Sequence, residues 1–96
     1  MPAELLKNVS VTSGNNSAQF QINVAPALLV IEQASGLTAK MQLLNPSSTN
    51  WVDITDNLGT LKTFTGNGTY DLSGLPQLTQ YRIAVTAGSG YFTALA

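Results

Sequence analysis

Two aspartates, Asp53 and Asp56, lie three residues apart and form the closest pair of acidic side chains in the sequence. Paired carboxylates can cleave a glycosidic bond as general acid and nucleophile, and together with Asn57 they could supply oxygen ligands to calcium. Asp53 falls in an expected strand, however, and residues 56–59 read Asp-Asn-Leu-Gly, which is typical of a turn. The regular spacing of a calcium-binding loop is absent. We therefore expect a structural turn here, with no catalytic residue and no bound metal.

Other chemistry is excluded by the residue types that the chain lacks. Its 96 residues include no His and no Cys, which excludes His-based triads, thiol nucleophiles, haem ligation and the usual zinc sites. The glycines at 66 and 68, and those at 88 and 90, do not open a helix after a strand, so we expect no phosphate-binding loop. We therefore expect a protein that is not an enzyme and that binds no cofactor.

Charge and hydropathy exclude two further classes of partner. The 4 Lys and Arg side chains are too few to neutralise a run of phosphates, so we expect no nucleic-acid partner. The longest apolar stretch, residues 25–31, is too short for a bilayer span, which needs about 20 residues. Residues 1–7 also lack the pattern of a secretory signal, so we expect no membrane partner.

The charged fraction of the chain is unusually low. Charged residues make up 9% of the sequence, against about 25% in average globular proteins, while the hydrophobic fraction of 44% is ordinary. Because a net charge near zero promotes association, we favour a surface that partners largely cover, including other copies of the chain. A trimer is one such assembly. The alternative is that Thr- and Asn-rich strands form an uncharged surface in a free protein.

Aromatic side chains are the best candidates for contacts. Trp51 could stack on a sugar ring or anchor an interface, or it could fill the core near one end of the fold. The same alternatives hold for Tyr70. Tyr91 and Phe92 are adjacent in an expected strand, and successive strand residues point to opposite faces, so at least one of the two should face away from the core. We take Trp51, Tyr70, Tyr91 and Phe92 as candidate partner-binding residues.

These side chains must be positioned by β-strands. Apolar and polar residues alternate in four segments, residues 8–12, 18–24, 39–44 and 81–86. Turn-forming sequences separate these segments and further short strands, including Ser35-Gly36, residues 87–90 and Asn67-Gly68 at a tight hairpin. The order predicts an all-β fold, an antiparallel β-sandwich of the jelly-roll or immunoglobulin-like kind with about eight short strands.

Two segments leave alternatives open. Residues 26–36 begin with Pro26 and end with Gly36, as a helix can, but the β-branched pair Val30-Ile31 favours a strand. Residues 1–8 carry no clear pattern, and we expect an N-terminal arm that is either frayed or laid along a neighbouring subunit. Residues 9–96 then form a single β-sandwich domain.

The segment from Thr38 to Ile54, in which Asn45-Pro46-Ser47-Ser48 precedes Trp51-Val52-Asp53, resembles small β-sandwich virion proteins of tailed bacteriophages. Residues 66–72, Gly-Asn-Gly-Thr-Tyr-Asp-Leu, and residues 81–88, Tyr-Arg-Ile-Ala-Val-Thr-Ala-Gly, are similar to the second half of those proteins. The Asn-Pro-Ser-Ser stretch replaces their usual Asp-Gly turn, and residues 1–37 match less well. The resemblance covers about residues 38–95.

The resemblance implies a non-enzymatic assembly role in a virion. We expect a capsid decoration (cement) protein that binds the outer surface of the major capsid protein lattice and is assembled in the cytoplasm of the host bacterium. A small fold without disulfides suits that reducing compartment, and repeated attachment sites let modest contacts hold firmly. The alternative is a module associated with a tail or fibre, which could bind carbohydrate through Trp51.

Overall fold

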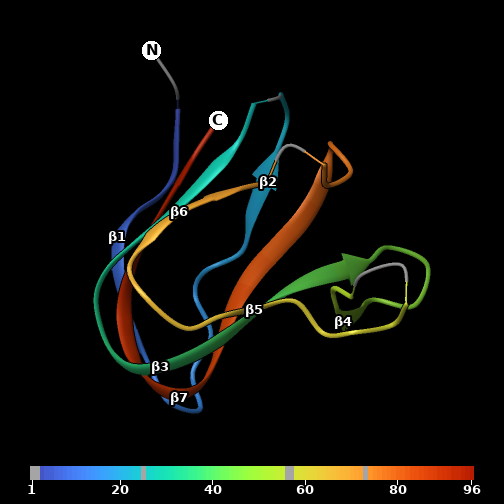
Figure 1. Ribbon diagram of the computed structural model, residues 1–96. Helices are drawn as coiled ribbons and strands as arrows, with labels where there is room; N and C mark the ends of the chain where they lie inside the picture. The colour runs from blue at the N-terminus through green and yellow to red at the C-terminus, as the bar shows by residue number, and fades with distance from the viewer. Residues whose placement is uncertain (1–2, 25, 56–57, 73) are drawn as a thin grey trace.

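The computed structural model describes residues 3–24, 26–55, 58–72 and 74–96, and these residues form seven β-strands (Figure 1). The strands are β1 Glu4–Thr12, β2 Phe20–Ile22, β3 Leu28–Asn45, β4 Asn50–Asp53, β5 Thr63–Phe64, β6 Gly68–Asp71 and β7 Thr79–Leu95. Every pairing between them is antiparallel. The described part of the chain holds no helix long and apolar enough to cross a membrane. The predicted all-β antiparallel fold is confirmed.

Strand β7 is the centre of the sheet. One of its edges pairs with β1 along residues 89–95 and with β2 along residues 79–81, and its other edge pairs with β3 over most of its length. The far edge of β3 pairs in turn with β6, β5 and β4. The chain therefore forms a broad ribbon, in which β3 and β7 are 18 and 17 residues long.

The ribbon bends sharply near its middle. Register shifts interrupt the pairing of β3 with β7 between residues 32 and 39 of β3, opposite Gly88. The backbone takes left-handed conformations at Gln33 (φ 54°), Gly36 (φ 58°) and Gly88 (φ 67°). Bulges of this kind bend paired strands and let each strand pass from one sheet into another. Both long strands therefore contribute to both layers of the fold.

The turns predicted at Ser35-Gly36 and at residues 87–90 are wrong. Both sequences lie inside strands, because pairing between β3 and β7 continues on either side of them. Glycine is favoured in bulges as well as in turns, so the residue types alone do not separate the two. The described residues of the sandwich consequently form seven strands, two of them long, where about eight short ones were expected.

The bend folds the ribbon into two layers (Figure 1). Strand β2 ends opposite Thr79, at one end of β7, whereas β3 begins opposite Leu95, at the other end. A straight strand of the length of β7 would extend about 55 Å, yet residues 23–27, which link β2 to β3, can reach only about 20 Å. The two ends of β7 must therefore lie close together, with the halves of the ribbon facing each other as a β-sandwich. The overall extents of 33 × 33 × 23 Å agree with this.

The core lies between the two layers. Most of the largest fully buried side chains come from β3 and β7. Those from β3 are Leu29, Ile31 and Met41, and those from β7 are Tyr81, Ile83, Val85 and Phe92. The alternation predicted for residues 39–44 is confirmed at its start, because Ala39 and Met41 are buried while Lys40 and Gln42 face outward. One face of each long strand therefore packs into the core, and the other face carries the polar side chains.

Residues 4–8 belong to β1, so the separate N-terminal arm predicted for residues 1–8 is wrong for them. Residues 1 and 2 lie outside the described residues. The edge of β7 accepts β1 as a partner, and the pairing extends to Ala3, whose N–H donates to the Ala96 carbonyl (2.7 Å). Residues 4–8 show no regular alternation because the register of β1 against β7 shifts twice before Val9. The backbone at Asn8 also has a positive φ of 50°.

The tight hairpin predicted at Asn67-Gly68 is also wrong. Strands β5 and β6 do not pair with each other as a hairpin requires; each pairs with β3, at residues 39–40 and 28–31 of β3 respectively. Residues 65–67 therefore connect two segments of the same sheet edge, on either side of the bend. The side-chain oxygen of Asn67 accepts a hydrogen bond from the Ala34 N–H (2.8 Å), which ties this crossing to the bulge in β3. The strand favoured over a helix near residue 30 is confirmed, since β3 begins at Leu28.

Candidate functional site

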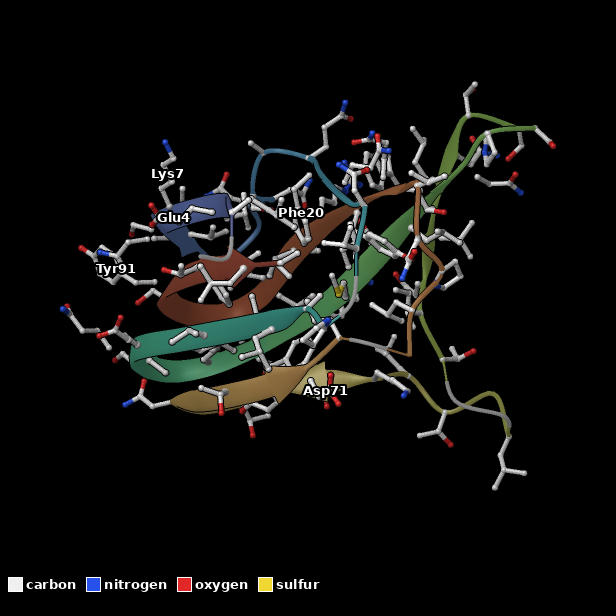
Figure 2. All side chains as sticks on the ribbon, turned by 90° about the horizontal axis from the view of Figure 1, so that it is seen from above. Glu4, Lys7, Phe20, Asp71 and Tyr91 are labelled. Atoms are coloured by element: carbon white, nitrogen blue, oxygen red, sulfur yellow. The ribbon has the colours of Figure 1, made fainter. Side chains whose placement is uncertain are left out.

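The structure separates the aromatic candidates. Phe92 is 0% exposed and belongs to the core, so its prediction as a partner-binding residue is wrong. Tyr91 points to the opposite face of β7 and is half-buried (Figure 2), as the alternation of a strand requires. Tyr70 is also half-buried, but its ring packs edge-on against Phe64 (4.7 Å between centroids) and its hydroxyl donates to the Gly66 carbonyl (3.0 Å). Tyr70 therefore has a structural role at the bend.

Trp51 lies on the outer surface of the sandwich, half-buried and outside the core. Strand β4 positions it there, because Trp51 pairs with Leu44 of β3 at the end of the β3–β4 hairpin. The guanidinium carbon of Arg82 lies 4.5 Å from the centroid of the Trp51 ring, which is a cation–π contact. Of the two alternatives for Trp51, core or contact, the core alternative is wrong.

Five outward side chains form a continuous group that we call the Trp51 face: Lys40, Gln42, Trp51, Asp53 and Arg82. Gln42 is at its centre, because it pairs with Asp53 on one neighbouring strand and with Arg82 on the other. Arg82 Nε–H donates to Gln42 Oε1 (2.7 Å), and Gln42 Nε2–H donates to Asp53 Oδ1 (2.9 Å). Lys40 Nζ contacts the Asp53 carboxylate at 3.1 Å. Each side chain thus holds the next in a fixed orientation.

The electrostatics of Asp53 indicate a structural carboxylate. Its pKa lies below the ordinary value of 3.8, mainly because Gln42 donates a hydrogen bond to the ionised form, and then because Lys40 does so too. A carboxylate held in this way is a poor general acid at neutral pH. Asp56 and Asn57, the other members of the possible carboxylate pair and calcium site, lie outside the described residues. The described part of the chain contains no group of three or more acidic side chains that could hold a metal.

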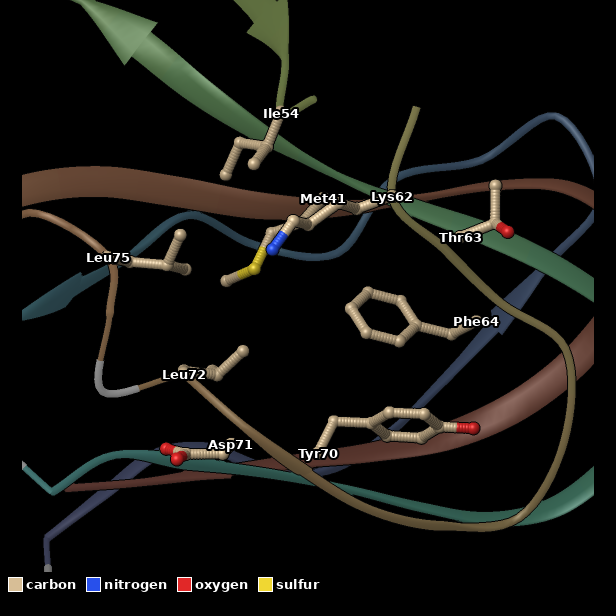
Figure 3. Close-up of a pocket in the computed structure, with 9 residues that line it drawn as sticks. All are labelled: Met41, Ile54, Lys62, Thr63, Phe64, Tyr70, Asp71, Leu72 and Leu75. Carbon is tan, nitrogen blue, oxygen red and sulfur yellow. The ribbon is translucent and has the colours of Figure 1, made fainter. Parts of the chain in front are cut away.

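An apolar cavity of about 300 Å³ opens beside the edge strand (Figure 3). It is lined by Met41, Ile54, Lys62, Thr63, Phe64, Tyr70, Asp71, Leu72 and Leu75. Because these residues come from both layers and from several separate segments, the sequence alone gave no sign of the cavity. Most of the lining is hydrophobic, so the cavity can accommodate an apolar group.

The chain around β4 carries exposed apolar side chains. We call residues 50–55 and 58–62 the β4 projection, because β4 lies beyond the body formed by β1, β6 and β7 (Figure 1). Val52, Leu58 and Leu61 are 46%, 91% and 38% exposed, and they are half of the large hydrophobic side chains that are exposed among the described residues. Since three exposed apolar side chains fall within this one segment, we take it as a candidate contact surface. No pattern in the sequence marks Leu58 or Leu61 as contact residues.

Comparison with known proteins adds no relative: the chain matches no protein-family model, no curated protein and no solved structure. Its function is therefore inferred from its own residues. The two surfaces that can make contacts are the Trp51 face and the β4 projection, and they share strand β4.

Proposed function

We propose that the protein is a non-enzymatic structural component of a tailed-bacteriophage virion, a capsid decoration protein that binds the outer surface of the major capsid protein lattice. The phage-like segments at residues 38–54, 66–72 and 81–88 support this proposal, as does the charged fraction of 9%. In this role the protein acts as a homo-oligomer, of which a trimer is one form, and it is incorporated into the virion in the cytoplasm of the host bacterium.

The observation that carries the proposal is the exposure of Leu58 and its neighbours on the β4 projection. A leucine side chain that is 91% exposed gains about 2 kcal/mol when a partner buries it. One such contact is weak on its own. On a capsid the same contact recurs at every lattice position, and oligomeric attachment adds the effects of several contacts. A small projection with a few apolar side chains is therefore sufficient for firm attachment to a lattice.

The long edge strand β1 is poorly suited to this attachment. Its exposed side chains include Glu4 and Lys7, and its register against β7 shifts twice. Charges and bulges on an edge strand oppose the addition of another strand. We therefore place the capsid contact on the exposed apolar side chains of the β4 projection, Val52, Leu58 and Leu61.

A module associated with a tail or fibre is the second candidate function. The Trp51 face favours it, since a partly exposed tryptophan beside polar side chains suits a sugar ligand. A decoration protein can carry the same face, because the Trp51 face and the exposed apolar side chains are different sets of residues.

The proposal is tested with capsids from a phage mutant that lacks this gene. Purified protein is mixed with these capsids, and the bound fraction is measured by co-sedimentation. We expect saturable binding, weakened about tenfold or more by Leu58→Asn, because losing the burial of one leucine removes about 2 kcal/mol. Leu78→Asn is the matched control, since Leu78 is 74% exposed on the connection between β6 and β7.

Each outcome bears on the proposal. The control variant should bind as the unchanged protein does, because Leu78 lies outside the β4 projection and its φ of 59° is one that asparagine tolerates. Absence of binding by the unchanged protein would contradict the decoration role. Equal binding by Leu58→Asn and the unchanged protein would show that the β4 projection is not the contact surface.

A further inference from the structure

We propose that the Trp51 face binds a neutral, hexose-based glycan, with one pyranose ring stacked on the Trp51 indole. This binding activity goes beyond capsid attachment and does not depend on it. A pyranose ring has an apolar face of C–H groups and a rim of hydroxyls. A site for it therefore combines an aromatic surface with hydrogen-bonding groups close to the edge of the ring.

The aromatic surface is provided by Trp51, the single tryptophan of the chain. Arg82 packs over the indole, and its Nε–H is tethered to Gln42 Oε1 (2.7 Å). This contact orients the indole while the side chain stays partly exposed on the outer surface. Trp51 also lies in a shallow concave surface to which Thr49 and Asn50 contribute. Because the Arg82 guanidinium occupies one face of the indole, the pyranose ring stacks on the opposite face of an aromatic group that is already held in place.

The hydrogen-bonding groups lie beside the indole on the same surface. Asp53 has two carboxylate oxygens with about four acceptor positions, and the contacts with Gln42 and Lys40 leave part of that capacity for a ligand. The side chain of Asp53 is 38% exposed and that of Lys40 is 22% exposed, so water and hydroxyl groups can reach both. The concave surface therefore offers donors and acceptors for sugar hydroxyls.

The charges of the face favour a neutral ligand. Asp53 offsets Lys40 through their contact at 3.1 Å. Arg82 is the remaining charge of the five side chains, and its guanidinium lies over the Trp51 ring. A nucleic acid could also stack a base on the indole, but its phosphates need a row of cations. The pairing of Lys40 with Asp53 leaves no such row on this face, so we commit to an uncharged glycan.

The face is ordered before a ligand arrives. The hydrogen bonds from Arg82 to Gln42 and from Gln42 to Asp53, together with the contact from Lys40, connect three strands through their side chains. Side chains that are already fixed lose little conformational entropy on binding. This order suits the weak individual contacts from which glycan recognition is built.

The test uses the full chain and defined probes. An array of bacterial surface polysaccharides is screened first, and cellohexaose, maltohexaose and chitohexaose are then titrated in solution. The fluorescence of Trp51 should change saturably with at least one of these glycans, because the chain has one tryptophan and that residue is in the site. In an NMR titration with the same glycan, the indole N–H of Trp51 and the side-chain amide of Gln42 should shift together.

Variants locate the binding. Calorimetry should show affinity about fivefold or more weaker for Trp51→Ala, since aromatic stacking is worth about 1 kcal/mol or more. Leu78→Asn is the control, an exposed side chain outside the Trp51 face (74% exposed), and it should bind as the unchanged protein does. Should Trp51→Ala not fold, the NMR shifts decide the question without a variant. The proposal is overturned if no array glycan and no hexaose binds at millimolar concentration, or if binding shifts residues other than those of the Trp51 face.

Discussion

Replacing Gly88 with alanine tests the bend that folds the ribbon into two layers. Gly88 has a φ of 67°, and a Cβ atom added to it would collide with the backbone carbonyl oxygens of Ser35 and Gly36. These atoms belong to the bulge of β3, so they cannot move aside as the end of a flexible side chain can. The close approach of two backbones at this point requires glycine.

The expected loss of stability has two parts. An alanine in the left-handed region costs about 1–2 kcal/mol, and forcing an extra carbon into a packed site costs about 1–3 kcal/mol. Together they predict that Gly88→Ala lowers the free energy of unfolding by about 2–5 kcal/mol. A domain of this length has a total stability of about 5–14 kcal/mol, so the variant should lose a large part of it.

Urea unfolding followed by circular dichroism measures this loss, and Gly14→Ala is the matched control. Gly14 has a similar φ of 82°, but an added Cβ would meet nothing within 4 Å. The control should lose only the conformational part, about 1–2 kcal/mol. Equal losses for Gly88→Ala and Gly14→Ala would refute the close contact between the two bulges.

Two further predictions concern the core. Phe92→Ala should destabilise the fold by about 3–5 kcal/mol because Phe92 is completely buried. Tyr91→Ala, on the outer face, should change stability by less than about 1 kcal/mol. Similar losses for the two variants in thermal unfolding would contradict the assignment of the two faces. Burial raises the pKa of the Tyr81 hydroxyl above its ordinary value of 10.0, so its neutral form stabilises the fold below that pH and this contribution is lost as pH rises through the pKa of the folded state. The free energy of unfolding should therefore fall more steeply between about pH 9 and about pH 12 in the unchanged protein than in Tyr81→Phe. Urea titrations at a series of pH values measure this free energy for both proteins. If it falls equally with pH in the two proteins, Tyr81 does not cause the fall.

The strands with a regular period of two could be predicted from the sequence in part. Met41 and Tyr81 each lie between polar residues, and the structure buries both. Within residues 18–24, however, only Phe20–Ile22 form a strand, and Val24, which the alternation placed on the buried face, is 57% exposed. The bends could not be predicted, because Ser35-Gly36 fits a turn as well as a bulge. The difference depends on whether β7 continues to pair with β3 beyond the glycine, and no local pattern contains that information.

The candidate site could be predicted only in part, because its contacts also depend on which strands pair with each other. Trp51 was selected by its residue type, but its contact with Arg82 depends on the order of strands across the sheet. Gln42 joins Asp53 to Arg82 only because β4 and β7 pair with opposite edges of β3. The alternation that places Lys40 and Gln42 on an outward face was the signal that could have identified them.

The central claim is that the protein is part of a virion and coats its capsid lattice. The most direct measurement is the quantity of this chain in purified virions of a phage that carries its gene, determined by quantitative mass spectrometry against the major capsid protein. We expect a constant ratio of this chain to capsid subunits, because the chain should occupy repeated lattice sites. Absence of the chain from purified virions would contradict the claim, and a few copies per particle would assign the protein to the tail or a fibre in place of the capsid surface.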